Sequence, residues 1–457
     1  MTSTLSEYYR CPDEFYPFEL SGKLSDKAGY FRFGETTVCY GRSSLHSLSE
    51  TFRLELTDVS AAVKECNSKC LLPFEATEIL DNLRLERYAN GQERHSPLRD
   101  FCTTAYYRLR PILPFKLRSC LKRVSLKGWD RKGFPAWPVD RTVEEINESL
   151  ICLAMKTLGI HEIPFVWFWP EGRSGCAVMT HDVETRAGLE FCDSLMDLDD
   201  SYGIKSSFQV IPEGRYLVSA ILLQQIRSRG FEANVHDWNH DGLLFKSPEV
   251  FLTRAEKINQ FAATHSVDGF RSGALYRNVA WYDALSFAYD MSVPNSGRLD
   301  PQWGGCCTTM PYFIGRILEI PVTTTQDYML FHLLGTYSTA LWQQEAERIF
   351  GGHGLASFIV HPDYVIEKRA RNTYKELLEY LSSLRSKRNI WIARPGEVNE
   401  WWRNRSQMKL VHNGSTWTIE GPNKERACVA YATLQGEELT YCLESGSSKH
   451  DRCSPPS

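Results

Sequence analysis

Residues 176–184 read CAVMTHDVE, an apolar run of four residues that leads into a polar cluster at 180–184. The run has the length and content of a buried β-strand. Short apolar runs lead in the same way into the polar clusters at 236–240, 269–272 and 360–363. Because α/β barrels keep their chemistry just beyond the ends of their strands, the four clusters predict one shared site.

From about residue 166 to 405 the sequence alternates strand-like runs, polar loops and amphipathic helices. Helical periodicity extends over 216–229, which ends at Gly230, and over 248–261 and 374–384. The strand-like runs lie at 176–179, 207–211, 231–235, 268–270, 317–322, 357–360 and 390–393. About seven β/α units of this size predict an α/β fold, an irregular (β/α)₇ barrel over residues 166–405.

The regions on either side of the predicted barrel have other patterns. Residues 1–165 mix strand-like pieces, such as 36–40, with helical stretches, and predict an N-terminal α+β region. Residues 406–457 predict a small C-terminal β-domain, because strand-like runs are separated by turn signals. These runs are 409–412, 416–419 and 428–431. The tail from 446 to 457 is predicted to be disordered.

Composition narrows the class of protein. The chain has 457 residues, of which 42% are apolar and 12% aromatic, and this is enough to bury sizeable cores. Lys and Arg number 52 against 56 Asp and Glu, for a net charge of −4. This balance gives no overall positive field, so we expect no nucleic-acid partner.

The N-terminal sequence and the cysteine pattern indicate in which cellular compartment the protein is expected. The first ten residues have no basic segment followed by an apolar one, and no apolar window is long enough to span a membrane. Fourteen Cys are scattered without zinc-type pairs, which favours reduced thiols. We therefore expect a cytoplasmic protein.

The segment 106–132 is strongly basic and has leucines at helical spacing. Such a segment could lie on an anionic membrane surface, which would place the protein at the inner face of the membrane. Alternatively, it is an amphipathic helix that packs on the barrel and turns its basic face to water.

Four residues are candidate metal ligands or bases. His236 and His240 are four apart, so on a helical turn their imidazoles share one face and can hold one metal ion. A carboxylate from another strand would complete the set. Asp182 and Glu184 are two apart and, on an extended strand end, point to the same side. One of them can bind metal while the other acts as a base.

Arg271 and His361 complete the candidate site. Arg271 follows an apolar run and could pair with the base. His361 follows the strand-like run 357–360 and is a candidate general acid. Either residue could instead have a purely structural role.

At these positions the chain resembles the polysaccharide deacetylase family, over about residues 170 to 400. The family's motif T-F-D-D-G is similar to residues 180–184, and its motif H-[ST]-x-x-H to 236–240. Its R-x-P-[YW] motif is matched loosely at 271–274, and its last motif, a His after an apolar run, at His361.

The resemblance implies roles for single residues. Asp182 would be the catalytic base, and Glu184 would bind the metal with His236 and His240, although the second carboxylate is displaced by one residue from the family pattern. Another alignment makes Asp182 the ligand and puts His181 near the base position. Arg271 would orient the base, and His361 would be the acid. The family's Pro is absent after Arg271.

The function implied is metal-dependent, with Zn²⁺ the expected ion. The enzyme would remove N-acetyl groups from a polysaccharide, an oligosaccharide or a lipid-linked sugar, so an N-acetylated carbohydrate is the expected partner. Two other hypotheses remain open at this point. One is a hydrolase of a non-sugar amide on the same barrel, and the other is a catalytically inactive carbohydrate-binding protein.

Overall fold

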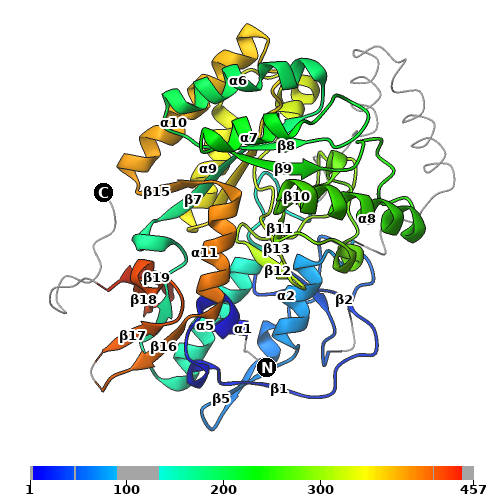
Figure 1. The fold of residues 1–457 in the computed structure, drawn as a ribbon. Helices are drawn as coiled ribbons and strands as arrows, with labels where there is room; N and C mark the ends of the chain where they lie inside the picture. The colour runs from blue at the N-terminus through cyan, green and yellow to red at the C-terminus, as the bar shows by residue number, and fades with distance from the viewer. Residues whose placement is uncertain (1–3, 46–47, 90–132, 415, 445–457) are drawn as a thin grey trace. The chain divides into compact units, whose positions relative to one another are not determined.

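The computed structural model describes residues 4–45, 48–89, 133–414 and 416–444. Its contacts divide the chain into two compact units (Figure 1). The first comprises residues 1–88, 141–173 and 400–457, and the second comprises residues 89–140 and 174–399. The basic segment 106–132 and the tail 446–457 lie outside the described residues.

The second unit is built on a curled nine-stranded sheet. The strand order is β12-β13-β11-β10-β9-β8-β7-β14, and β15 also pairs with β7. All neighbouring strands are parallel except β12 and β13. The strands are β7 (Gly175–Val183), β8 (Ser207–Val210), β9 (Glu232–His236), β10 (Gly269–Arg271), β11 (Tyr289–Asp290), β12 (Tyr312–Ile314), β13 (Ile317–Glu319), β14 (Leu355–Ile359) and β15 (Ile390–Ala393). The expected α/β class is confirmed, and every expected run contains a strand, but the sheet has nine strands instead of seven.

Threonine side chains connect β14 to the segment that follows β13. The hydroxyl of Thr323 donates to the carbonyl of Leu355 at 2.7 Å and accepts the N–H of Ser357 at 2.8 Å. Thr324 donates to the carbonyl of Ser357, also at 2.7 Å. These bonds bring the chain beyond β13 against β14, which curls the sheet into an open barrel.

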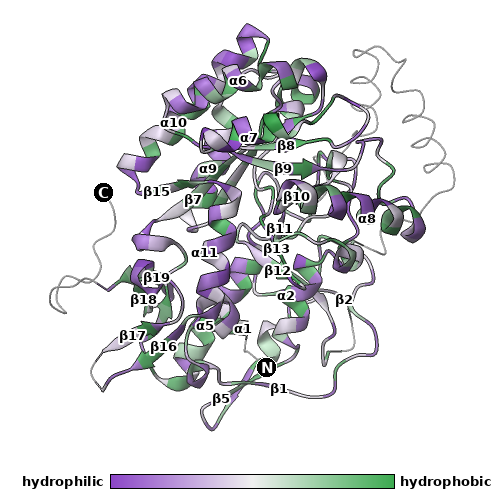
Figure 2. Ribbon diagram, viewed as in Figure 1, coloured by the Kyte–Doolittle hydropathy of each residue, from purple (hydrophilic) through white to green (hydrophobic). Residues whose placement is uncertain are grey.

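Helices connect most of the parallel strands. They are α6 (Arg186–Ser201), α7 (Ala220–Ser228), α8 (Pro248–His265), α9 (Ala340–Gly351) and α10 (Lys368–Lys387). Polar residues predominate on the visible side of α6 and α10 (Figure 2), whereas the buried residues of α10, such as Leu377 and Leu381, belong to the main core. Each helix therefore buries one apolar stripe.

One expected helix begins later than its periodicity predicts. Residues 216–229 were expected to be helical, but α7 begins at Ala220, because the hydroxyl of Ser219 accepts the N–H of Leu222 at 3.1 Å and caps it there. Tyr216 instead turns its hydroxyl to the carbonyl of Val183. Gly230 ends the helix with a φ of 79°, as expected.

The described residues of the first unit form small sheets and a few helices. The helices are α1 (Thr4–Tyr9), α2 (Ala76–Arg84) and α5 (Thr142–Leu158), and residues 400–407 of α11 (Pro395–Gln407) also belong to this unit. The strands are β1 (Phe18–Leu20), β2 (Gly29–Phe33), β3 (Thr37–Gly41), β4 (Lys64–Cys66), β5 (Lys69–Leu72), β6 (Glu162–Val166), β16 (Lys409–His412), β17 (Trp417–Glu420), β18 (Val429–Gln435) and β19 (Glu438–Leu443). β18 pairs with both β19 and β6, so one sheet joins segments from the two expected flanking regions.

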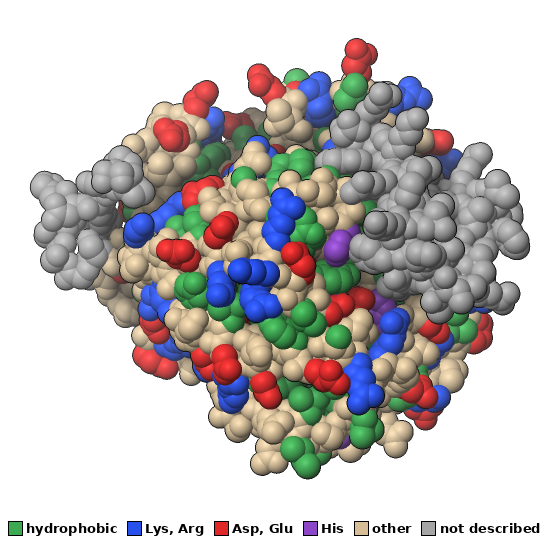
Figure 3. Space-filling model, turned by 90° about the horizontal axis from the view of Figure 1, so that it is seen from above, with side chains coloured by type: hydrophobic (Ala, Val, Ile, Leu, Met, Phe, Trp, Pro, Cys, Tyr) green, Lys and Arg blue, Asp and Glu red, His purple; other side chains and the backbone are tan. Residues whose placement is uncertain are grey.

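The described residues also bear on the expectations about thiols and membranes. Ten described cysteines form no disulfide, as expected for reduced thiols. The expectation of reduced thiols is wrong at Cys442, which is disulfide-bonded. None of the described helices combines the length and the apolar character needed to cross a bilayer. On the face shown in Figure 3, Lys and Arg side chains lie interspersed with Asp and Glu.

Candidate active site

The candidate residues meet at the carboxyl ends of parallel strands. β9 and β10 are paired in register so that His236 lies beside Arg271. β7 pairs with β14, and the two strands lead into Glu184 and His361. Because parallel strands end at the same edge of a sheet, the four polar clusters found in the sequence lie together there.

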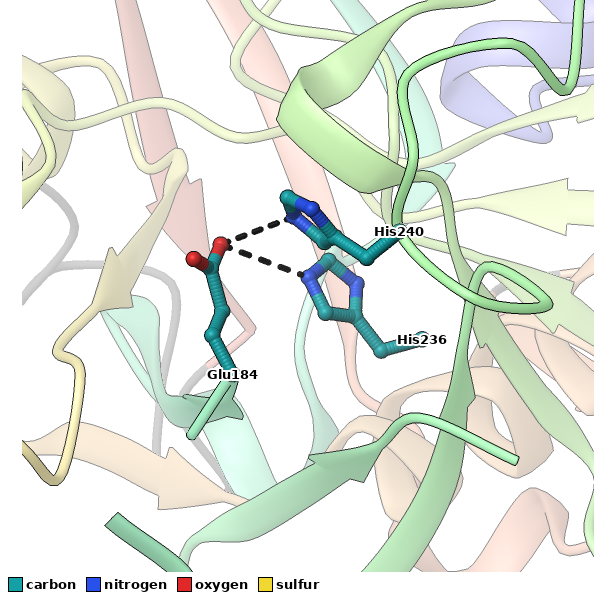
Figure 4. Close-up of side chains that lie close together, drawn as sticks. All are labelled: Glu184, His236 and His240. Carbon is teal, nitrogen blue, oxygen red and sulfur yellow. Dashed lines mark ion pairs between the residues drawn. The ribbon is translucent and has the colours of Figure 1, made fainter. Parts of the chain in front are cut away.

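Glu184, His236 and His240 form a cluster that could hold a metal ion. Their candidate ligand atoms all lie within 4.8 Å of one another. Glu184 Oε1 is 2.8 Å from His240 Nε2 and 3.8 Å from His236 Nε2, and both rings face the carboxylate (Figure 4). The side chains come from the end of β7, the end of β9 and the loop after β9.

The hydrogen bonding of the two histidines fits a metal ligand set. His236 Nδ1 lies 3.2 Å from the carbonyl oxygen of Arg271, an atom that only accepts, so Nδ1 carries the proton. The Nε2 atoms of His236 and His240 are buried and lie near Glu184 Oε1, but among the described residues neither makes a hydrogen bond of good geometry, and His240 Nδ1 makes none either. Buried polar atoms without a partner are costly, so two of them aimed at one carboxylate oxygen suit a cation between them.

The loop after β9 needs unusual backbone conformations to present His240. His240 has a φ of 53°, and Asp237 has a φ of 59°. The loop is held by the N–H of Asp237, which donates to the Arg271 carbonyl at 2.8 Å, and by Arg215, which donates to the His240 carbonyl at 3.0 Å. A Cβ atom at Gly273 would come 2.4 Å from Asp237 Oδ2, so any other residue here would force the Asp237 side chain to move.

Asp182 and Arg271 form a buried ion pair beside the cluster. Arg271 Nη1 donates to Asp182 Oδ1 and to Thr180 Oγ1, each at 2.7 Å. Its Nε donates to the carbonyl of Met291 at 2.9 Å, which fixes the guanidinium. Asp182 Oδ2 lies 3.9 Å from His236 Nε2.

The charges around the two carboxylates keep them ionised. Burial acts to raise the pKa of Asp182, but the positive charge of Arg271, with help from His236, holds that pKa below its usual value. Burial likewise acts to raise the pKa of Glu184, but the neighbouring His240 and His236 hold it well below the usual value. Both side chains can therefore act as carboxylates at neutral pH.

His361 also lies close to Glu184 and is held by Asp327. His361 Nε2 is 3.5 Å from Glu184 Oε1. Its Nδ1 bonds to Asp327 Oδ1 at 2.6 Å, and its backbone N–H donates to Asp327 Oδ2 at 2.7 Å. Burial acts to lower the pKa of His361, but the charge of Asp327 raises it well above the usual value.

The structure brings all six candidate residues together and adds one that the sequence analysis missed. Asp327 follows the strand-like run 317–322 at the same edge of the sheet, and this position was the available signal. His181 is turned away from the cluster, because its ring bonds to the carbonyl of Val360 and to Asp199. In this geometry His181 does not occupy the position of a base.

No protein-family model matches the chain, and no curated protein matches it. Solved structures that are similar to it include a protein from Mycobacterium smegmatis described as a polysaccharide deacetylase, with 16% identity and a TM-score of 0.41 over 52% of this chain and 93% of that one. An allantoinase has 12% identity and a TM-score of 0.39 over 51% and 92%. A family 4 acetyl xylan esterase from Clostridium thermocellum, solved with a cobalt ion, has 13% identity and a TM-score of 0.33 over 50% and 91%.

Proposed function

We propose that this protein is a metal-dependent hydrolase that removes N-acetyl groups from a carbohydrate, which could be a polysaccharide, an oligosaccharide or a lipid-linked sugar. The observation that carries the proposal is the convergence on Glu184 Oε1 of three imidazole nitrogens, from His236, His240 and His361. Two of these nitrogens suit a cation, and the third belongs to a ring that Asp327 holds in place.

In this proposal Glu184, His236 and His240 hold the metal ion, which we expect to be Zn²⁺. Two imidazoles and one carboxylate leave coordination positions open, as catalytic zinc sites do. When bound, such an ion polarises the acetamide carbonyl and makes a water molecule more acidic. The choice of Glu184 over Asp182 as ligand is supported by their partners, since Asp182 Oδ1 is already engaged by Arg271.

Asp182 is the proposed base. Its carboxylate is ionised and lies on the same side of the strand end as Glu184, since both are within 4 Å of His236 Nε2. It can therefore accept a proton from water beside the metal ligands. Arg271 positions it, because one guanidinium nitrogen binds both Asp182 and Thr180.

His361 is the proposed acid. An amine leaves an acetamide only when it is protonated, so the site needs a proton donor opposite the base. Nδ1 of His361 faces Asp327 and Nε2 faces Glu184, so Nε2 is the atom that can deliver the proton. The carboxylate of Asp327 stabilises the protonated ring before transfer.

The test is acetate release from a panel of substrates by protein loaded with Zn²⁺. The panel should contain N-acetylated mono- and oligosaccharides, a lipid-linked N-acetylated sugar and simple non-sugar acetamides. We expect turnover on at least one sugar and much less on the simple amides. Turnover only on non-sugar amides would assign the site to another amide hydrolase. Binding of sugars without acetate release would contradict the proposal and indicate an inactive carbohydrate-binding protein.

A further inference from the structure

A second buried polar group lies behind the candidate site. His181 stands between Thr180 and Asp182 on β7, and alternation along the strand turns its side chain to the opposite face from Asp182. The ring is fully buried. Its Nδ1 lies 2.9 Å from the carbonyl oxygen of Val360, and its Nε2 lies 3.0 Å from Asp199 Oδ2.

Asp199 is the centre of this group. It is a fully buried carboxylate on α6, and it is bound by three side chains from different elements. Tyr374 on α10 donates its hydroxyl at 2.6 Å, and Ser206, just before β8, donates at 2.6 Å. His181 on β7 is the third, so two helices, one strand and the segment before β8 meet at one carboxylate.

The group touches the backbone at the place where β7 and β14 stop pairing. Their ladder ends with Thr180 opposite Ile359, and the N–H of Val360 donates to the carbonyl of Thr180 at 3.0 Å. Beyond that backbone bond, the next hydrogen bond between the two segments is made by a side chain: the His181 ring bonds to the carbonyl of Val360. Val360 immediately precedes His361.

We propose that His181, held by Asp199, is a positioning residue that sets the place of His361 relative to Glu184. The carbonyl of Val360 belongs to the peptide group that enters His361, so fixing that carbonyl fixes the backbone from which the acid projects. Asp327 holds the ring of His361 through Nδ1. This inference rests on the proposed function, because it assumes that His361 is the general acid.

The residue type at position 181 agrees with such a role. The polysaccharide deacetylase motif T-F-D-D-G has Phe at the position of His181. A Phe side chain would fill a similar volume but could make no hydrogen bond. This chain has a histidine whose two nitrogens are both engaged, one by a backbone carbonyl and one by a carboxylate. Buried polar groups of this kind specify a single arrangement of the elements that they join.

The test compares two tyrosines that each donate to a carboxylate, fully buried at Asp199 and partly buried at Glu232. Tyr374→Phe removes a donor to Asp199, whereas Tyr289→Phe removes a donor to Glu232, at the opposite end of β9 from the site. His181→Phe breaks both bonds of the ring. Each variant is loaded with Zn²⁺, checked for metal content, and assayed on an acetamide that the wild type accepts and on an aryl acetate.

We expect His181→Phe to lower kcat on the acetamide by about 10²-fold, which is typical of an ångström-scale misplacement, with a much smaller loss on the aryl acetate and little change in KM. Tyr374→Phe should shift the amide-to-ester ratio in the same direction, and Tyr289→Phe should leave it unchanged. An unchanged ratio in His181→Phe, or an equal shift in Tyr289→Phe, would overturn the inference. If His181→Phe does not fold, Tyr374→Phe decides the question, since it removes only a hydroxyl.

Failure of the proposed function would be visible separately. If the wild type releases acetate from neither substrate, the proposed function is wrong, and the positioning role is then tested by crystal structures of wild type and Tyr374→Phe. A displacement of His361 Nε2 from Glu184 Oε1, which are 3.5 Å apart, is expected in the variant. An unchanged separation would overturn the inference.

Discussion

Asp327 binds His361 at two points, accepting the backbone N–H with one carboxylate oxygen and facing ring Nδ1 with the other. This fixes both the position and the orientation of the ring. It also leaves Nε2 as the nitrogen that faces Glu184. The proposed acid therefore depends on a residue that lies 34 positions earlier in the chain.

Asp327→Asn should impair the acid while leaving the metal in place. The amide can still accept a hydrogen bond, but it carries no charge to stabilise the protonated ring, so we expect turnover to fall by about 10²-fold. The measurement is kcat at full metal loading. Turnover equal to that of the wild type would show that Asp327 has only a structural role.

The two carboxylates at the end of β7 should respond differently to substitution. Asp182→Asn should keep the metal and lose turnover by about 10²- to 10⁴-fold, because an amide cannot accept the proton of water. Glu184→Gln should lose both metal and turnover. Metal content by elemental analysis separates the two cases, and loss of the metal in Asp182→Asn alone would support the alternative alignment.

His361→Ala should distinguish substrates by their leaving groups. An amine must be protonated to depart, whereas an activated phenolate leaves with less help, so the loss should be much greater on an acetamide than on an aryl acetate. Both rates are measured at equal metal content. Equal losses on the two substrates would indicate that His361 positions the site and donates no proton.

Glu345 on α9 predicts a pH dependence of stability outside the site. Its buried carboxylate accepts the N–H of Thr325 at 3.0 Å and the hydroxyl of Thr325 at 2.5 Å. Burial raises the pKa of Glu345 from 4.5 to about 8, although the bonds from Thr325 oppose the shift. A group whose pKa is raised by folding stabilises the folded state below its unfolded pKa and loses that contribution as the pH rises.

The free energy of unfolding should therefore fall between about pH 5 and pH 8, by up to a few kcal/mol, since one pKa unit corresponds to about 1.4 kcal/mol. Glu345→Gln stays neutral and can keep both contacts, so it should flatten that fall. The measurement is denaturant unfolding of both proteins across this pH range. The same slope in the variant would show that Glu345 does not cause it.

Much of the barrel could be predicted because its signals are local. The run at 176–179 and the polar cluster after it give both a strand and the position of Asp182 and Glu184. The pair His236 and His240 was found from its spacing, but the expected helical turn is wrong: His236 ends β9, and His240 lies in the loop after it with a φ of 53°. The start of α7 was predicted too early because the helical periodicity of apolar residues extends back to Tyr216. The residue that begins the helix is the N-cap Ser219.

What escaped prediction depends on contacts between distant segments. The bond of Asp327 to His361 and the link between β18 and β6 join residues that no local pattern connects. β19 was not expected either, although it pairs along its length with β18. The alternative alignment put His181 near the base position, and only its bonds to Val360 and Asp199 show that its ring points elsewhere.

The central claim is that Glu184, His236 and His240 hold a metal ion. It is tested most directly by anomalous diffraction at the zinc absorption edge, on crystals of protein loaded with Zn²⁺. We predict one strong peak between Glu184 Oε1 and the Nε2 atoms of His236 and His240, at about 2.0–2.2 Å from each. The peak should disappear in the double variant His236→Ala, His240→Ala. No peak at this position in the wild type, or an undiminished peak in the double variant, would contradict the account.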